Sequence, residues 1–301
     1  MATFGKSVRV YLKDGTTTGI RFVEIVNHTI QSIACPRIKI NELYTFSESN
    51  KPGIYFLFGN DEATSNTKIY IGEAENILDR LQEHSTKKDF WNEVIFFTSK
   101  DDNLTKSHVK YLESKAIQIA FQSKRDIVDN IHQPQPSTLP IADRESMEEL
   151  LIYIRLLLGI FGKHTLEPIS TKAFLNQEET NELKLNVGAL KAKAIQTNEG
   201  IVVCKGSDAA KESTPNLGVG YQKLREQLIS NEIILEDGNV YTFQDDYLFT
   251  SPSAAAAIIT GYNINGRDTW KDKRGKSLNQ IEKEKLESVK SNNIAQALAT
   301  I

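Results

Sequence analysis

Two short apolar segments, each containing a tyrosine and a glycine, constrain the fold of this chain more than any other feature. The first is GIYFLFG at 53–59, and the second is KIYIGEAENI at 68–77. The polar stretch NDEATSNT between them is typical of a hairpin loop, so the two segments are expected to pair as antiparallel strands. Tyr55 and Tyr70 are then expected at matching ends of adjacent strands, each beside a glycine that allows close backbone approach. Taken alone, a strand tyrosine is usually core filling.

The segment after the second tyrosine predicts a helix near 74–85. Its buried stripe recurs at helical spacing and consists of Ala74, Ile77, Leu78 and Leu81. Arg80 and His84 are four residues apart and therefore lie next to each other on one side of that stripe. By itself this spacing is more often a solvated face than a functional site.

A second expected helix, near 103–121, carries a carboxylate among apolar residues. At about 100° per residue, one arc of this helix is formed by Val109, Leu112, Ala116, Ile117, Ile119 and Ala120. Glu113 falls inside that arc. A carboxylate there must be paired, protonated or bound to a metal, because isolated burial of charge is unfavourable. An internal salt bridge and a metal ligand both remain open.

This arrangement resembles the GIY-YIG nuclease family, whose members cut nucleic-acid phosphodiester bonds. Six positions match the family in order, and the resemblance implies that the catalytic residues are Tyr55, Tyr70, Arg80, His84, Glu113 and Asn130. It also implies that Glu113 binds the metal, Mg²⁺ or Mn²⁺. Lys68 is expected to orient the water or the phosphate, with a solvated lysine as the alternative. The loop between the two tyrosine segments is longer than is common in the family.

The resemblance further implies a metal-dependent endonuclease, a hydrolase that acts on single- or double-stranded DNA. One tyrosine takes the proton of the attacking water, with assistance from His84, and which tyrosine does so stays open. Arg80 is expected to hold a phosphate oxygen, since a planar guanidinium grips such oxygens well. Defence against foreign DNA, or DNA repair, follows from the family alone.

The C-terminal third resembles a second module, the RAMA-type domain and a related uncharacterised domain. The segment that carries this resemblance is DDYLFTSPSAAAAIITGYNINGRDTWKDKRGKSLNQI. Such domains occur beside restriction and DNA-modification enzymes, which implies DNA recognition. The residues expected to bind nucleic acid are Arg267, Trp270, Lys271, Lys273 and Arg274, since aromatic and basic side chains suit such a face. A core tryptophan with a solvated basic turn is the alternative.

The expected fold class is α/β in the broad sense (α+β): a small antiparallel or mixed sheet flanked by helices. Strands are expected from period-two alternation over 4–46, including IKI at 38–40, and at 91–99. A helix is expected at 143–159. The expected division is an N-terminal β extension at 1–48, the nuclease domain at 49–135, a helix and linker at 136–184, a RAMA-like domain at 185–281 and a tail at 282–301.

Composition limits the function classes. The formal net charge is −3, which argues against a basic protein that coats DNA generally. Cys35 and Cys204 are far apart and have no metal-ligand spacing, so free thiols in a reducing cytoplasm are expected. The start MATFGKSVRV does not have the pattern of a signal peptide. The stretch at 150–161 is too short to span a bilayer and contains Arg155, so it predicts a buried helix and no membrane partner.

Two further hypotheses remain besides the nuclease. The chain could be a catalytically silent nucleic-acid-binding or regulatory protein on the same fold, although Tyr55, Tyr70, Arg80 and Glu113 are all present. It could also be a protein-interaction scaffold, a class that the lack of net basic charge suggests. A homo-oligomer is compatible with the sequence.

Overall fold

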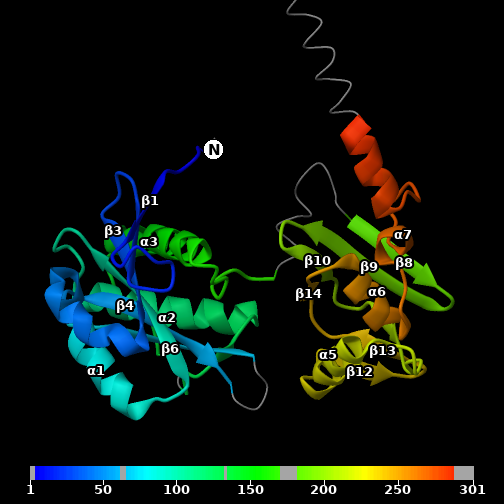
Figure 1. Ribbon diagram of the computed structural model, residues 1–301, viewed down its shortest axis with the longest axis horizontal. Helices are drawn as coiled ribbons and strands as arrows, with labels where there is room; N and C mark the ends of the chain where they lie inside the picture. Colours follow the sequence, from blue (N-terminus) through cyan, green and yellow to red (C-terminus); the bar gives the residue numbers. More distant parts are fainter. Residues whose placement is uncertain (1–3, 62–65, 132–133, 170–181, 288–301) are drawn as a thin grey trace, which may run out of the picture. The chain divides into compact units, whose positions relative to one another are not determined.

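The computed structural model describes residues 4–61, 66–131, 134–169 and 182–287. The chain divides into two compact units, Met1–Pro168 and Ile169–Ile301, called unit 1 and unit 2 below (Figure 1). Both units combine helices with β-sheets, which confirms the α+β class. Some expected segments lie partly outside the described residues: the loop at 60–67, the proline-rich segment at 132–140, the linker at 164–184 and the tail at 282–301.

Unit 1 is built on a seven-stranded sheet with the order β1-β2-β3-β6-β4-β5-β7. Its strands are β1 (Val8–Leu12), β2 (Arg21–Ile25), β3 (Ile30–Pro36), β4 (Gly53–Asn60), β5 (Thr67–Ala74), β6 (Trp91–Ser99) and β7 (Ile127–Val128). Neighbouring strands are antiparallel except β5 and β7. The strands of the expected N-terminal extension thus continue the sheet of the tyrosine strands through the pairing of β3 with β6.

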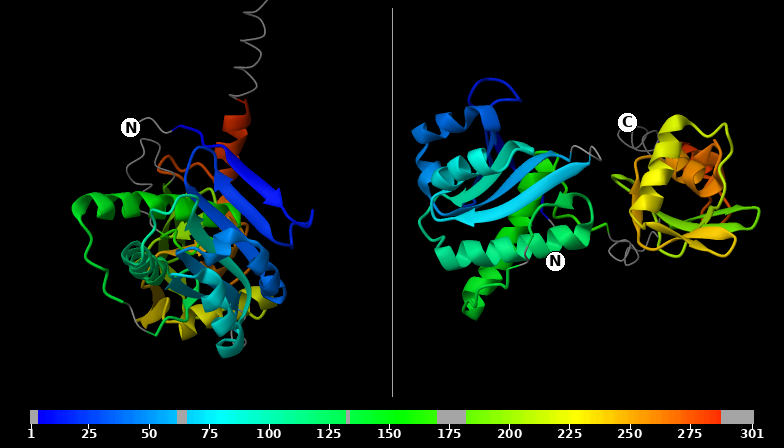
Figure 2. Two further views of the ribbon diagram at one scale, coloured as in Figure 1. Left: turned by 90° about the vertical axis from the view of Figure 1, so that its left-hand side faces the viewer. Right: turned by 90° about the horizontal axis from the view of Figure 1, so that it is seen from below.

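Helices cover both faces of this sheet (Figure 2). They are α1 (Ile77–Lys87), α2 (Lys106–Ser123) and α3 (Ile141–Ile160). Side chains alternate along a strand, and in β4 this divides them between two cores. Tyr55 and Leu57 pack with α1, whereas Ile54 and Phe56 pack with α2 and α3. Strand β5 contacts both helices, so α1 and α2 can each contribute side chains near it, from opposite faces of the sheet.

One expected strand is wrong. The segment IKI at 38–40 lies within a 3₁₀ helix, η1 (Arg37–Thr45), followed by a second, η2 (Ser47–Asn50). Ile40 and Leu43, three residues apart, are buried in the α1-side core, while Ile38 is exposed. Spacing of three suits one face of a 3₁₀ helix, so packing against α1 overrides the short apolar alternation.

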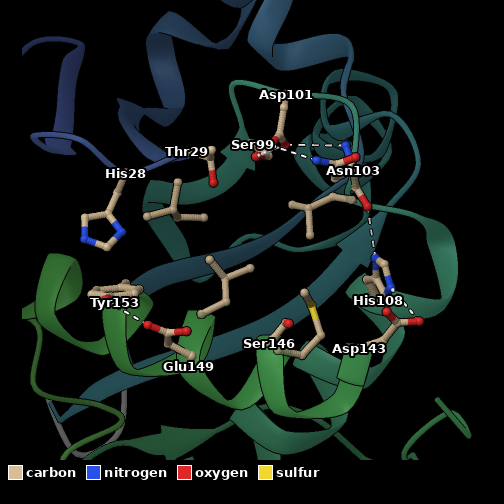
Figure 3. A pocket seen from close by; sticks show the side chains of 14 residues that line it. His28, Thr29, Ser99, Asp101, Asn103, His108, Asp143, Ser146, Glu149 and Tyr153 are labelled. Atoms are coloured by element: carbon tan, nitrogen blue, oxygen red, sulfur yellow. Dashed lines mark hydrogen bonds and ion pairs between the residues drawn. The ribbon is translucent and has the colours of Figure 1, made fainter. Parts of the chain in front are cut away.

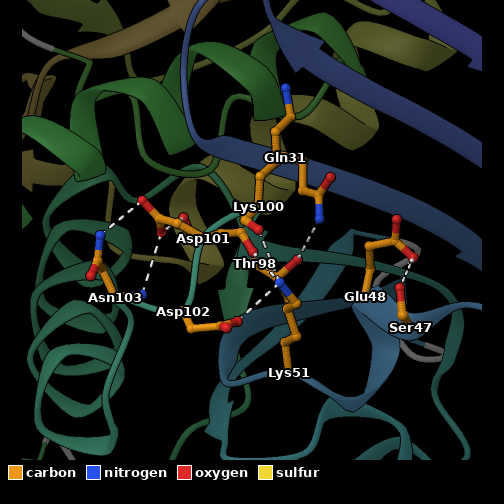
Figure 4. Close-up of polar contacts among 10 residues, drawn as sticks. Gln31, Ser47, Glu48, Lys51, Thr98, Lys100, Asp101, Asp102 and Asn103 are labelled. Carbon is orange, nitrogen blue, oxygen red and sulfur yellow. Dashed lines mark hydrogen bonds and ion pairs between the residues drawn. The ribbon is translucent and has the colours of Figure 1, made fainter.

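The beginning of β4 is fixed by Lys51 (Figure 4). Its ammonium donates to the carbonyl oxygens of Ser99 at 3.3 Å and Lys100 at 3.1 Å, and lies 3.3 Å from the Asp102 carboxylate. These contacts tie the chain just before β4 to the end of β6. They therefore hold the strand that carries Tyr55 in place.

Unit 2 contains two smaller sheets. The first has the order β14-β10-β9-β8 and the second β11-β13-β12. Their strands are β8 (Glu182–Val187), β9 (Leu190–Thr197), β10 (Gly200–Val203), β11 (Asp208–Ala210), β12 (Ile234–Asp237), β13 (Val240–Phe243) and β14 (Tyr247–Phe249). The helices are α5 (Val219–Ser230), α6 (Pro252–Thr260) and α7 (Gly266–Thr269), with a further helical stretch at 278–287.

The alanine-rich helix α6 forms the centre of unit 2. It is buried almost all round, as expected for a helix that is apolar on every side. Ser251 caps it by accepting from the Ala254 backbone N–H at 3.1 Å, and Pro252 occupies its first turn. Gly261 ends it at φ +77°, where a Cβ atom would overlap the Glu212 carbonyl oxygen. Ser251, Pro252 and Gly261 are thus local start and stop signals of this helix.

Within the described residues, none of the helices combines the length and apolarity that crossing a bilayer requires. The apolar stretch at 150–161 lies mostly in α3, and its buried residues pack on the unit 1 sheet. Cys35 and Cys204 are both free.

Candidate active site

The tyrosine strands pair in the register that places Tyr55 directly opposite Gly72. Residues opposite each other on paired strands project to the same face, so the Tyr55 ring lies over Gly72. A Cβ atom on Gly72 would overlap the ring and hydroxyl of Tyr55. Tyr70 projects to that face too, and its ring centroid lies 6.3 Å from that of Tyr55. The structure therefore brings the two tyrosines together, with glycine making the space.

The Tyr55 hydroxyl is the centre of a buried hydrogen-bond network. Its oxygen lies 2.7 Å from Nε2 of His84 and accepts a hydrogen bond from Nε of Arg80 at 3.4 Å. Burial lowers the pKa of His84 to about 4, and the charge of Arg80 acts in the same direction. A neutral His84 can accept the phenol proton at Nε2 while Nδ1 carries the ring proton. Burial also raises the pKa of Tyr55, so this phenol stays protonated.

Tyr70 is more exposed to solvent than Tyr55 and lies beside the ammonium group of Lys88. It is partly exposed, and its ring centroid is 5.0 Å from that of His84. The Lys88 ammonium lies 4.2 Å from the Tyr70 ring centroid and 2.6 Å from the Asp129 carboxylate. Asp129 also pairs with Lys68 at 2.8 Å. Two lysines share one carboxylate, which leaves net positive charge beside Tyr70.

Glu113 projects from α2 and is held in a partly buried position. Burial raises its pKa to about 7, and the negative charge of Glu73 acts in the same direction. A backbone hydrogen bond from Glu73 and the positive charge of Arg80 act the other way. Neither Glu73 nor Glu113 forms an ion pair within the described part of the chain. The described residues therefore do not supply the internal salt bridge that the sequence left open.

These groups gather at the free edge of β5. Strand β7 pairs with β5 only through Lys68 and Ile69. At the next position, the Asn130 side-chain amide makes the two hydrogen bonds that a neighbouring strand would otherwise make. Its Oδ1 accepts from the Ile71 N–H at 3.0 Å, and its Nδ2 donates to the Ile71 carbonyl oxygen at 2.8 Å. Both polar atoms of Asn130 are thus used to position β5. Beyond Ile71, no described strand pairs with the edge of β5 at Gly72.

Sequence reasoning missed three charged residues of this site: Glu73, Lys88 and Asp129. Glu73 directly follows Gly72 on β5. Its side chain therefore projects to the opposite face of the sheet from Tyr70, the face that α2 covers. Lys88 lies four residues after His84, a spacing that could have suggested it. Asp129 has no local signal, because only the parallel pairing of β7 with β5 brings it to Lys68.

The cluster around Trp270 differs from its expectation. Trp270 is fully buried, and its Nε1 donates to the Pro252 carbonyl at 3.1 Å. This burial corrects the expectation of a stacking face, because the indole offers no surface to a base. Three of the basic residues nearby are paired with acids or an amide: Arg267 with Asn279 and Glu282, Lys273 with Glu182, and Arg274 with Asp272. Lys271 is exposed and forms no described ion pair.

Unit 1 also contains a cavity of about 370 Å³ away from these groups (Figure 3). It lies beside α3, and its polar side chains largely satisfy one another. Tyr153 donates to Glu149 at 3.1 Å, and Nε2 of His108 lies 3.8 Å from the Asp143 carboxylate. None of the expected catalytic residues lines it. The cavity is therefore separate from the tyrosine site.

The buried neutral His84 gives the protein a measurable pH signature. Unfolded His84 gains a proton below its ordinary pKa of 6.5, whereas folded His84 gains one only near 4, so protonation favours the unfolded chain in between. Glu113, whose folded pKa is raised, contributes in the opposite direction between about 7 and 4.5. Relative to wild type, His84→Gln should therefore gain stability as pH falls from 6.5 to 4, by up to about 3 kcal/mol.

This difference is measured by urea unfolding in EDTA across that pH range. Each unit contains one tryptophan, so Trp91 fluorescence in a Trp270→Phe background reports on unit 1. A wild-type-to-variant difference that does not change with pH would show that His84 is not held neutral by its surroundings.

In the comparison with known protein families, a match was found for unit 2 but not for the tyrosine site. Residues 183–282 match a domain of unknown function, DUF4357. No curated protein and no solved structure matches the chain. The match covers about a third of the chain and begins after every residue of the unit 1 site.

Proposed function

We propose that this protein is a metal-dependent endonuclease that hydrolyses DNA phosphodiester bonds. The observation that carries the proposal is the convergence of Tyr55, His84, Arg80 and Glu113, which are linked by hydrogen bonds and charge interactions. This set matches, residue by residue, the positions that resemble the GIY-YIG family. A purely structural role in salt bridges explains these residues poorly. Glu113 has no ion-pair partner among the described residues, and His84 is buried and neutral.

The carboxylates of Glu113 and Glu73 fit a hard divalent cation. Both are oxygen donors, the charge of Glu73 raises the pKa of Glu113, and Mg²⁺ or Mn²⁺ prefers such ligands. Glu113 would hold the ion, with Glu73 as a second donor. When bound, the ion would stabilise negative charge that develops on phosphate oxygens.

Arg80 is arranged to hold a phosphate oxygen. Its Nε is occupied by Tyr55 and its Nη1 by Glu83 at 2.8 Å, whereas Nη2 has no partner among the described residues. The side chain is 41 % exposed, so a phosphate oxygen can reach that nitrogen. The hydrogen bond to Tyr55 fixes the guanidinium plane. Tyr55 and His84 thus position Arg80, and Arg80 holds the substrate.

Tyr70 is the better acceptor for the proton of the attacking water. Tyr55 is fully buried with a raised pKa, and its hydroxyl is already hydrogen-bonded with His84 and Arg80. Tyr70 is partly exposed, so water can reach it, and the Lys88 ammonium lies 4.2 Å from its ring centroid. Lys68 supports this arrangement through the shared Asp129. The free thiols of Cys35 and Cys204 support a reducing, cytoplasmic setting, and defence against foreign DNA or DNA repair is the proposed role.

The two tyrosines should respond differently to loss of their hydroxyls. Tyr70→Phe should lower the cleavage rate by about 10²-fold or more while leaving stability unchanged, because Tyr70 is partly exposed and its proposed role is in proton transfer. Tyr55→Phe should destabilise unit 1 by about 1–3 kcal/mol, because Nε2 of buried His84 loses its partner. The measurements are single-turnover cleavage of a labelled duplex in Mg²⁺ and urea unfolding. Equal, mild effects on cleavage from both variants would favour structural tyrosines and refute the assignment of Tyr70.

A further inference from the structure

One face of the β14-β10-β9-β8 sheet carries a row of lysines. Lys184 on β8 lies directly opposite Lys193 on β9. On its other side Lys184 forms an antiparallel bridge with Lys271, through backbone hydrogen bonds of 2.8 and 2.9 Å. Directly opposite residues project to the same face. Three lysines from three neighbouring backbone segments therefore stand side by side, and we call their surface, together with Lys191 and Lys205, the lysine face.

The lysine face lies on the solvent side of the sheet. Leu183, Leu185, Ala192 and Ala194 project inward and belong to the unit 2 core. The alternating residues between them are exposed, and Lys191 stands opposite Asn186. The period-two pattern thus separates an apolar core face from an outer face that is basic over Lys184, Lys191 and Lys193. Farther along, the outer face carries Glu182 and the buried residues Ile195 and Val202.

Acids lie near this face, but none forms an ion pair with its lysines in the described part of the chain. Within the described residues, no ion pair is formed by Lys184, Lys191, Lys193, Lys205 or Lys271. Glu182, on the same face, pairs with Lys273 at 3.2 Å. Like charges directly opposite each other destabilise a sheet. A fold that keeps Lys184 opposite Lys193 without a carboxylate between them is arranged for an external anion.

The lysines surround a groove of about 530 Å³. Lys205, Gly206 and Ser207 form one wall, next to Lys191 and Lys193. The hydroxyl of Ser207 accepts from the Lys193 N–H at 3.0 Å and donates to the Lys193 carbonyl at 3.2 Å, which holds this wall to β9. The one carboxylate in the lining, Asp208, accepts from the Lys191 backbone N–H at 3.0 Å. The groove is therefore basic and firmly built.

We infer that the lysine face binds the sugar–phosphate backbone of DNA. A row of ammonium groups spaced as neighbouring strands suits a polyanion whose charges are closely spaced along a line. The groove lining contains no aromatic residue to stack on bases, and its one apolar side chain, Ala192, is buried and too small to insert into a bilayer. It therefore reads charge rather than sequence. The choice of DNA rests on the proposed nuclease function, for which unit 2 would supply substrate affinity.

The test compares two triple variants of the full chain with equal charge. The face variant is Lys184→Gln, Lys191→Gln, Lys193→Gln. The control variant replaces three lysines elsewhere in unit 2 and is Lys211→Gln, Lys223→Gln, Lys283→Gln. Binding of a fluorescent DNA duplex is measured at several KCl concentrations in EDTA, so that cleavage plays no part. Thermal unfolding of each variant is recorded, and the face variant should unfold at or above the wild-type temperature because like charges are removed.

The face variant should flatten the log–log salt dependence of DNA binding by about 2 to 3 units, whereas the control variant should change it by less than one. Equal slopes for the two variants, or no DNA binding by the wild type, would overturn the inference. Lysine-dependent binding to vesicles of anionic phospholipid without binding to DNA would overturn it as well, in favour of a membrane surface.

Failure of this inference and failure of the nuclease proposal are distinguishable. If the face variant loses DNA affinity but the wild type cuts nothing in Mg²⁺ or Mn²⁺, the lysine face stands and the nuclease proposal fails. If the wild type cuts DNA and both variants bind with the wild-type slope, the nuclease proposal stands and the lysine face is not the DNA surface.

Discussion

Replacing Glu113 by glutamine should lower DNA cleavage by a factor on the order of 10³ while leaving DNA affinity in EDTA unchanged. Glutamine keeps the shape of the side chain but removes the carboxylate that would hold the metal ion. The lysine face, which lies in the other unit, is untouched by the change. The measurement pairs single-turnover cleavage in Mg²⁺ with a binding titration in EDTA.

The same variant should be more stable than the wild type when no metal is present. At pH 8 the wild-type protein must keep ionised a carboxyl whose pKa burial has raised to about 7. Removing that charge should raise the free energy of unfolding of unit 1 by about 1–3 kcal/mol. Added Mn²⁺ should stabilise the wild type and not the variant. A variant that cuts at the wild-type rate would refute Glu113 as the metal ligand.

The second large effect is expected from Gly72→Ala. Its Cβ atom would overlap the hydroxyl and ring of Tyr55, which is fully buried and has no room to move aside. Overpacking, together with loss of the Tyr55–His84 hydrogen bond, should destabilise unit 1 by about 2–4 kcal/mol and remove cleavage. Trp91 fluorescence during urea unfolding, in the Trp270→Phe background, measures the first effect.

Gly159→Ala is the matched control in the same unit. Its Cβ atom would meet only the Glu167 carboxylate oxygen, at 3.5 Å, and alanine favours the α3 helix that contains it. This variant should be as stable as the wild type or gain about 0.5 kcal/mol. If Gly72→Ala were equally harmless, Tyr55 would not be held by the close strand contact described here.

The sequence predicted the elements of the site better than their surroundings. The tyrosine strands, α1 and α2 followed from period-two and helical spacing, because those patterns are local. The 3₁₀ helix η1 did not, since Ile40 and Leu43 are placed by packing against α1 rather than by their own neighbours. Asp129 and Asn130 depend on the parallel pairing of β7 with β5, a long-range contact with no local signal.

Charge was the least predictable property of the candidate site. The basic turn around Trp270 was expected to bind DNA, yet most of its cations are paired with acids and its indole is buried. Of the lysine face only Lys271 was expected to bind nucleic acid, because its members are scattered over 184–271 and meet only through strand register. A composition with net charge −3 conceals a local basic surface of this kind.

The most direct test of the central claim is metal-dependent cleavage by the full-length wild-type chain. The protein, freed of metal with EDTA, is incubated with supercoiled plasmid and with labelled single- and double-stranded oligonucleotides, while Mg²⁺ or Mn²⁺ is titrated in. Glu113→Gln, purified in parallel, controls for contaminating nucleases. We expect nicked or linear plasmid only with metal and only with the wild type. Intact DNA at every metal concentration, or equal cleavage by the variant, would contradict the assignment of the tyrosine site as a metal-dependent nuclease.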